Sequence, residues 1–124
     1  MRFMTIWKPA NTQEVEGGVP PSPEHMAEMG KLIEELARCG VLLATDGLLA
    51  TSKGARVKLS KGKVTVTDGP FAETKELIAG YAIFRLQSKA EAIELTKRFL
   101  SVAGEGEVEV RQMYDKPAYA EGKQ

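Results

Sequence analysis

One histidine and two aspartates are the residues of this chain best suited to acid–base chemistry. His25 stands three positions after Ser22, a good N-cap, so it falls in the first turn of an expected helix. The positive end of that helix disfavours an imidazolium and favours a neutral base or hydrogen-bond acceptor. Asp46 and Asp68 each precede a glycine, and either could orient His25 or bind a ligand hydroxyl. The alternative is structural: each aspartate caps its own turn, and His25 is a surface residue.

Arginine and aromatic side chains are the candidates for ligand binding. Arg85 and Arg111 lie in alternating stretches, and on a covered sheet face their charge requires a partner. That partner is either Glu109 or a second subunit, or else an anionic ligand such as a carboxylate. The aromatic residues expected to contact the same ligand are Trp7, Tyr81 and Phe71.

The sequence predicts neither a metal centre nor a cofactor. One histidine and one cysteine cannot form a His/Cys metal site, although a site built of carboxylates alone stays open. No glycine motif that would cradle a phosphate is present, and no Ser-His-Asp spacing indicates a hydrolase triad.

Charge and composition narrow the class of protein. Lys+Arg and Asp+Glu number 17 each, so the formal net charge is zero and the basic excess of a nucleic-acid binder is lacking. No apolar run approaches the length of a membrane span, and the first residues do not resemble a signal peptide. The single cysteine, Cys39, allows no internal disulfide and is expected to be a packing residue. These features predict one cytoplasmic domain that binds neither nucleic acid nor membrane.

The periodicity predicts two helices and six strands. Helices are expected between Ser22 and Gly40 and between Ser88 and Gly104, with Ser88-x-x-Glu91 as a capping box. Met26, Met29, Ile33, Leu36 and Ala37 form the expected core stripe of the first helix. Strands are expected over 2–8, 41–50, 56–60, 63–67, 81–87 and 107–114, and Lys61-Gly62 makes a hairpin of the third and fourth. The segment 9–21 is a long loop that could serve as a lid or pocket wall, and 71–78 is expected to be a loop.

This order predicts an α+β fold, a ferredoxin-like β-α-β-β-α-β sandwich with an inserted hairpin. We expect the face toward the helices to carry Met4, Ile6, Phe84, Leu86, Val108 and Val110. The opposite face would then carry Phe3, Trp7, Tyr81, Ile83, Arg85, Arg111 and Met113. This second face is too apolar for open solvent, and no third helix covers it. A second copy of the sheet would cover it, which predicts a homodimer with a polar cavity.

The run TDGPFAETKE, from Thr67 to Glu76 and followed by Gly80-Tyr81, resembles the DGPF signature of the YCII-related domain family. Three other stretches are similar to the same family: Gly40 to Leu43 leading to Gly47-Leu48, Gly54 to Val57, and Val108 to Arg111. The resemblance implies a single domain over 1–116, a polar tail over 117–124, and a dimeric α+β barrel. It further implies kinship with muconolactone isomerase and related small-molecule enzymes. In such proteins a histidine near the start of the first helix is proposed to act with an aspartate, and one branch is linked to dehydrochlorination.

Two functions follow as hypotheses. The first is a lyase- or isomerase-like enzyme for a small aromatic or carboxylated molecule. His25 would be its acid or base, Asp68 or Asp46 the orienting partner, and Arg111 or Arg85 the anion anchor. The alternative is a non-catalytic ligand-sensing or regulatory module with a transcription partner such as a sigma factor, because some relatives of the family accompany sigma factors.

Overall fold

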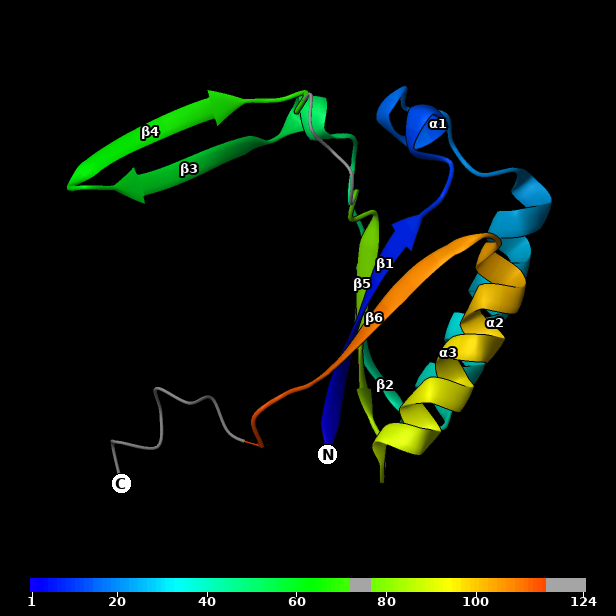
Figure 1. The fold of residues 1–124 in the computed structure, drawn as a ribbon. Coiled ribbons are helices and arrows are strands. Elements are labelled where there is room, and N and C mark those ends of the chain that lie inside the picture. Colours follow the sequence, from blue (N-terminus) through cyan, green and yellow to red (C-terminus); the bar gives the residue numbers. More distant parts are fainter. Residues whose placement is uncertain (72–76, 116–124) are drawn as a thin grey trace.

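The computed structural model describes residues 1–71 and 77–115, and its centre is a four-stranded antiparallel sheet (Figure 1). The strands are β1 (Arg2–Pro9), β2 (Leu42–Gly47), β5 (Gly80–Arg85) and β6 (Gly106–Gln112), in the order β2-β5-β1-β6. Most of the expected loop over 71–78 and the predicted tail over 117–124 lie outside the described residues.

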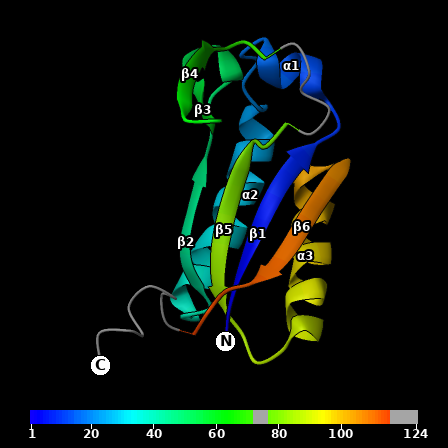
Figure 2. The ribbon, with the colours of Figure 1, turned by 60° about the vertical axis from the view of Figure 1, so that its left-hand side comes forward.

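Two long helices pack on one face of this sheet (Figures 1 and 2). They are α2 (Pro23–Arg38) and α3 (Lys89–Ala103), and both begin at the predicted caps. The Ser22 hydroxyl oxygen accepts a hydrogen bond from the His25 backbone N–H at 3.1 Å, and Ser88 accepts one from Glu91 at 3.2 Å. The β-α-β-β-α-β order, with both helices on one face, confirms the predicted ferredoxin-like fold.

The predicted hairpin is also confirmed, and it forms a sheet of its own. It consists of β3 (Ala55–Ser60) and β4 (Lys63–Asp68), joined by Lys61 and Gly62 with φ of 52° and 77°. Two positive φ values match the twist of a tight hairpin turn. The hairpin projects away from the helices, on the other side of the main sheet (Figure 1).

The loop expected over 9–21 contains a short helix that the sequence did not predict, α1 (Thr12–Glu16). A 3₁₀ turn, η1 (Thr51–Lys53), connects β2 to the hairpin. Glu16 links these two segments, because its carboxylate accepts hydrogen bonds from the Thr51 backbone N–H at 2.9 Å and from the Thr51 hydroxyl. The loop is therefore attached to the base of the hairpin.

The predicted faces of β1 were wrong. Phe3 is only 1% exposed and belongs to the core with Leu32 and Leu36 of α2, Phe84 and Leu86 around β5, and Ala92 of α3. Trp7 meets Phe99 of α3 edge-on, with ring centroids 5.4 Å apart. Phe3 and Trp7 thus face the helices, and Met4 and Ile6 face away, as their pairing with Ile83 and Tyr81 requires. The predicted faces of β5 and β6 agree with this register.

Two details of α2 also differ from the expected core stripe. Leu32 and Leu36 are its buried residues, while Met26 is exposed and so is Ala37. Cys39, expected to pack, is exposed as well. The apolar stripe is therefore centred between Met29 and Leu36, which leaves the first turn of α2 outside the core.

Candidate functional site

The three predicted acid–base residues lie toward the same end of the sheet. In this antiparallel arrangement β1 and β2 run in the same direction, since both are antiparallel to β5. Asp46 is near the end of β2, and α2, with His25 in its first turn, begins after β1 has ended. Asp68 ends β4, at the base of the hairpin that rises from this end (Figure 1).

Of these residues, Asp46 is the one that the structure brings next to another candidate. Asp46 lies directly opposite Tyr81 on β5, and Tyr81 lies opposite Ile6 on β1. Ile6 is opposite Glu109 on β6, so one row of side chains crosses the sheet on the face away from the helices. We call this surface the open face; its residues are Arg2, Met4, Ile6, Lys8, Ala44, Asp46, Tyr81, Ile83, Arg85, Glu109 and Arg111. The row combines a carboxylate with a phenol, a pair able to bind or deprotonate a ligand hydroxyl.

His25 is not joined to either aspartate. It is half-buried on α2, in the helix layer, and within residues 1–71 and 77–115 no hydrogen bond or ion pair involves the His25, Asp46 or Asp68 side chain. The same residues contain no group of three or more histidine, cysteine, aspartate or glutamate side chains placed to hold a metal ion. A single ligand that contacts His25 and Asp46 would have to lie across the end of the sheet.

The open face carries an ion-paired cluster that the sequence reasoning only partly identified. Glu109 accepts a hydrogen bond from the Lys8 ammonium at 3.1 Å and from Arg111 at 3.0 Å. These bonds, that from Lys8 first, lower the pKa of the Glu109 carboxyl below its ordinary value. Arg111 thus makes the ion pair that was one of its two predicted roles. Lys8, whose side chain is only 12% exposed, was missed because the phase of β1 was assigned incorrectly.

The other end of the open face is basic. Arg85 lies directly opposite Arg2, and Arg2 donates to the Tyr114 carbonyl oxygen at 2.7 Å. Two like charges in opposite positions disfavour each other unless an anion lies between them. However, Arg85 is four residues from Tyr81, about 13 Å along the strand, beyond the reach of one small ring bound at Asp46. Arg85 and the acid–base candidates therefore do not form one small pocket within a single chain.

Phe71 and the Asp68-Gly69-Pro70 turn pack against the segment that follows β2. A Cβ at Gly69 would lie 1.7 Å from the Thr51 carbonyl oxygen, so only glycine fits there. The Phe71 N–H donates to the Thr51 hydroxyl at 3.2 Å, and the Arg56 guanidinium lies 4.0 Å from the centre of the Phe71 ring. In the described structure these residues of the motif hold the hairpin base in place, a role that sequence spacing alone does not reveal.

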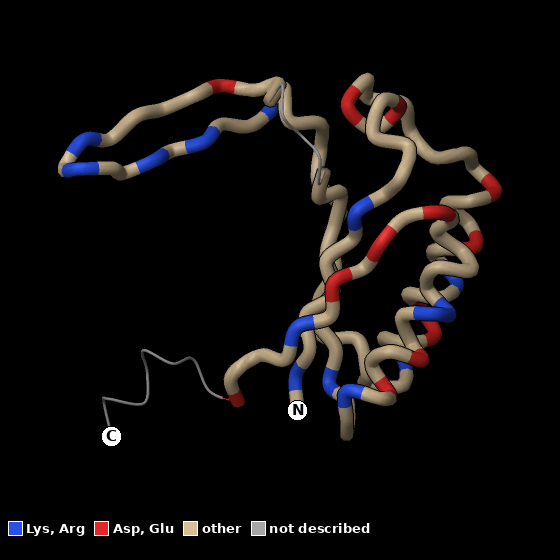
Figure 3. The backbone as a smooth tube through the Cα atoms, viewed as in Figure 1, with Lys and Arg blue, Asp and Glu red and all other residues tan. Residues whose placement is uncertain are grey.

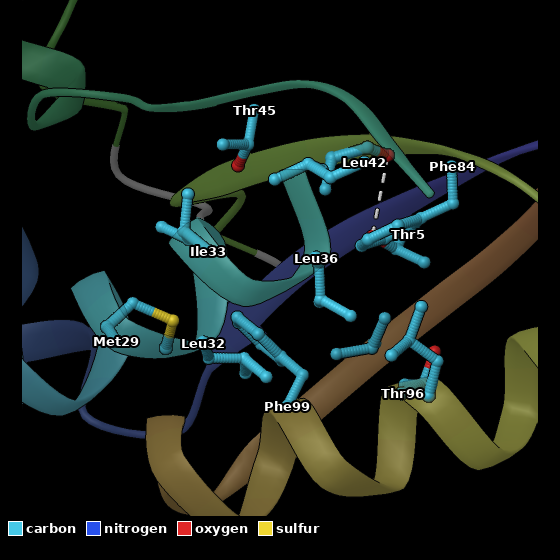
Figure 4. A pocket seen from close by; sticks show the side chains of 13 residues that line it. Thr5, Met29, Leu32, Ile33, Leu36, Leu42, Thr45, Phe84, Thr96 and Phe99 are labelled. Atoms are coloured by element: carbon cyan, nitrogen blue, oxygen red, sulfur yellow. Dashed lines mark hydrogen bonds between the residues drawn. The ribbon is translucent and has the colours of Figure 1, made fainter. Parts of the chain in front are cut away.

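A small cavity of about 40 Å³ lies between the helices and the sheet (Figure 4). Figure 4 shows Phe84 and Thr5 from the sheet facing Leu32, Leu36, Thr96 and Phe99 from the helices. Its threonine hydroxyls bond to backbone carbonyls, as Thr96 does to Ala92 at 2.7 Å. An apolar space of this size holds about one water and is a packing feature of the core. Trp7 borders this helix-side core, so it lies on the opposite side of the sheet from Tyr81 and Asp46.

No helix in the described part of the chain is both long and apolar enough to span a membrane.

Comparison with solved structures assigns the class of protein. The fold matches 5-chloro-2-hydroxyhydroquinone dehydrochlorinase of Burkholderia phenoliruptrix AC1100, solved in complex with 2,5-dihydroxybenzoquinone. The match covers 92% of this chain and 94% of the other, with a TM-score of 0.55 at 12% identity, a likeness of fold. The chain is thus an α+β protein of the ferredoxin-like architecture.

Comparison of sequences assigns the family. A sequence model of the YCII-related domain matches residues 1–116, and the chain belongs to this family. A relative from Rhizobium meliloti (strain 1021), an uncharacterized protein, is 33% identical over 72 residues, which span 58% of each protein. The resemblance carried by the DGPF stretch is thereby confirmed.

Proposed function

We propose that this protein is a homodimeric enzyme for a small hydroxylated aromatic molecule, with a lyase- or isomerase-like reaction at the end of the sheet that holds Asp46. The observation that carries the proposal is the half-buried His25, whose imidazole has no partner among the described residues, at the sheet end that also presents Asp46 beside Tyr81. The fold shared with a dehydrochlorinase supports an aromatic substrate class.

The homodimer is proposed because the open face is apolar at its centre. Met4, Ile6, Tyr81 and Ile83 adjoin one another there, and the register places them on the face away from α2 and α3. Such a face is stabilised when a second sheet covers it. A covering copy would also exclude water from Asp46 and Tyr81, which strengthens hydrogen bonds to a bound ring.

The reaction proposed for a chlorinated hydroxyhydroquinone consists of proton transfers and the departure of chloride. His25 accepts the proton of a ring hydroxyl and, as the imidazolium, delivers it to the carbon that bears chlorine, which gives the keto form. The neutral His25 then accepts a second hydroxyl proton as a C=O bond forms, and the electron pair of the C–Cl bond leaves with chloride. The net change is loss of HCl, so no oxidant or reductant is required. Asp46 is the proposed carboxylate partner, because Asp68 lies on the exposed hairpin.

The anion-anchor role is proposed for the basic end of the open face. Arg85 and Arg2 would bind the carboxylate of an elongated ligand, or that of a ligand bound separately from His25. Arg111 is engaged with Glu109 and is the weaker candidate.

The experiment is a chloride-release assay of the purified full chain with chlorinated hydroxyhydroquinones. His25→Asn is expected to lower kcat/KM by about 100-fold or more, the range for loss of an acid–base group. Asp46→Asn should reduce kcat/KM more than Asp68→Asn. Lys31→Gln, an exposed position on the same helix, is the matched control and should behave as wild type.

Two results would contradict the proposal. Wild-type turnover in His25→Asn would remove this residue from the chemistry. Absence of both chloride release and binding of hydroxybenzoquinones, tested by calorimetry on the folded wild-type protein, would remove the substrate class.

A further inference from the structure

The β3–β4 hairpin has one face made entirely of aliphatic side chains. Val57 is opposite Val66, and Leu59 is opposite Val64, so all four project to the same side. Each of the four is between 61% and 71% exposed, and every residue of both strands is exposed. We call this surface the aliphatic hairpin face. It lies outside the core and outside the candidate site.

A hairpin with such a face needs support from another surface. Two strands alone are marginally stable in water, and they become stable when a hydrophobic face packs against something else. An exposed strand pair with four aliphatic residues is also prone to association. Within the described structure the hairpin is attached only at its base, through Gly69, Phe71 and Thr51.

We propose that the aliphatic hairpin face docks on a second copy of this chain, so that each hairpin is an arm that holds its partner. This inference rests on the homodimer of the proposed function and adds an interface to it. The hairpin projects beyond the open face, on the side from which a covering copy would approach (Figure 1). An arm in that position extends past the edge of its own sheet toward its partner.

Charge complementarity points to a copy of this chain as the occupant. The hairpin carries Arg56, Lys58, Lys61 and Lys63 against one acidic residue, Asp68, while the whole chain is formally neutral. The remainder of the chain therefore has an equal acidic excess. Acidic residues gather on α1, the first turns of α2 and the start of β6, toward the end of the sheet from which the hairpin rises (Figure 3).

This charge complementarity fits a dimer whose two-fold axis runs parallel to the strands. It places the acidic ends of both copies side by side, so the basic arm of one passes over the acidic end of the other. The acidic residues at that end include Glu14 of α1, Glu24 of α2 and Glu107 of β6. The aliphatic residues supply the buried area. Arg56, Lys58 and Lys63 project from the opposite face of the arm, so their charge adds longer-range attraction to the acidic end rather than contacts within the interface.

Thiol reactivity tests this arrangement directly. In a Cys39→Ser background, which removes the single native thiol, a cysteine is introduced by Val64→Cys on the aliphatic face or by Thr65→Cys on the opposite face. Alkylation rates are measured from nanomolar to micromolar protein, in parallel with sedimentation. We expect dimer formation to slow the reaction of the Val64→Cys protein at least tenfold and to leave that of Thr65→Cys unchanged.

A second measurement uses the dimer itself. Leu59→Thr/Val64→Thr removes the aliphatic surface and keeps residues that favour strands. It should raise the dimer dissociation constant at least tenfold, while Thr65→Ser/Thr67→Ser on the other face serves as the control.

The outcomes separate the two proposals. A wild type that stays monomeric at micromolar concentration overturns the homodimer and the arm together. A dimer in which both introduced thiols react equally fast overturns the arm and leaves the homodimer standing. Protection of the Val64→Cys thiol only when another macromolecule is added would show a different partner and would overturn the assignment to a second copy.

Discussion

The two faces of the main sheet differ although the same four strands form them. The inner face meets α2 and α3 and has a closed core, with Phe3, Phe84 and Leu86 buried. The open face has an apolar centre and charged ends, and the hairpin on its side is exposed along its whole length. The inner face thus accounts for the stability of one chain. The open face is the surface that we propose a second copy covers.

The difference between the two faces of the sheet is tested most strongly at two adjacent residues of β5. Phe84→Ala removes a buried aromatic side chain and should lower the free energy of unfolding by about 3–5 kcal/mol, at any protein concentration. Ile83→Ala, on the open face, should have a smaller effect that depends on protein concentration, because a dimer is stabilised by mass action. Urea unfolding at two concentrations measures both. Equal, concentration-independent losses would show that the open face is not an interface.

The attachment of the hairpin is tested at Gly69. Gly69→Ala places a methyl group against the Thr51 carbonyl oxygen, a backbone atom that cannot move aside without displacing η1. We expect a loss of about 1–3 kcal/mol, the usual range for overpacking, together with faster proteolysis within the hairpin. A Gly69→Ala protein with the stability and proteolysis pattern of wild type would contradict the close contact.

A glycine-to-alanine substitution in the helix layer should stabilise the protein, in contrast to the one at Gly69. Gly30 lies inside α2, and a Cβ at this position meets no atom within 4 Å. Gly30→Ala should therefore raise the free energy of unfolding by up to about 1 kcal/mol, the difference in helix propensity. Thermal unfolding followed by circular dichroism measures the change. A decrease would mean that this part of α2 is covered by a surface that a single chain lacks.

The smallest expected effect is on how the stability of the protein depends on pH in acid. Hydrogen bonds from the Thr51 side chain and then its backbone lower the pKa of Glu16, and the Arg98 guanidinium, 2.6 Å from Glu35, lowers the pKa of that carboxyl chiefly by hydrogen bonding. A lowered folded-state pKa gives stability that is fully present above the ordinary glutamate pKa and is lost as the pH falls through the folded value. Glu16→Gln should reduce this acid dependence at the hairpin base, and Glu35→Gln should do so between α2 and α3.

Amide hydrogen exchange from pH 6 to pH 3 distinguishes the two sites. In Glu16→Gln the pH response near Thr51 should weaken, while that of α2 and α3 stays as in wild type. An unchanged response near Thr51 would show that this carboxylate does not hold the segment.

The helices could be predicted from the sequence because their signals are local. Ser22 and Ser88 cap helices by bonds to backbone groups three residues away, and the hairpin turn depends on Lys61 and Gly62 alone. The phase of β1 could not be predicted in this way. Phe3 and Trp7 on one side and Met4 and Ile6 on the other are all apolar, so alternation does not show which set is inside. That is decided by the register with Phe84 and by the contact with Phe99.

The candidate site, too, could be predicted only in its local features. The place of His25 in the first turn of α2 is a local property and was correct. The neighbours of each residue were not predictable, because they come from distant segments. Glu16, Thr51 and Phe71 meet through hydrogen bonds between three separate parts of the chain. Arg2 and Lys8 were missed because their positions follow from the phase of β1.

The packing of Trp7 makes its fluorescence a natural probe of the inner face of the sheet. The single tryptophan is wedged between Phe99 and Gly106, where a Cβ would lie 2.5 Å from the indole ring. Its emission therefore reports whether α3 and β6 are packed together. Because the indole lies on the inner face, events on the open face should leave the emission unchanged. Tryptophan fluorescence can thus follow folding while a label on the hairpin follows assembly, each without interference from the other.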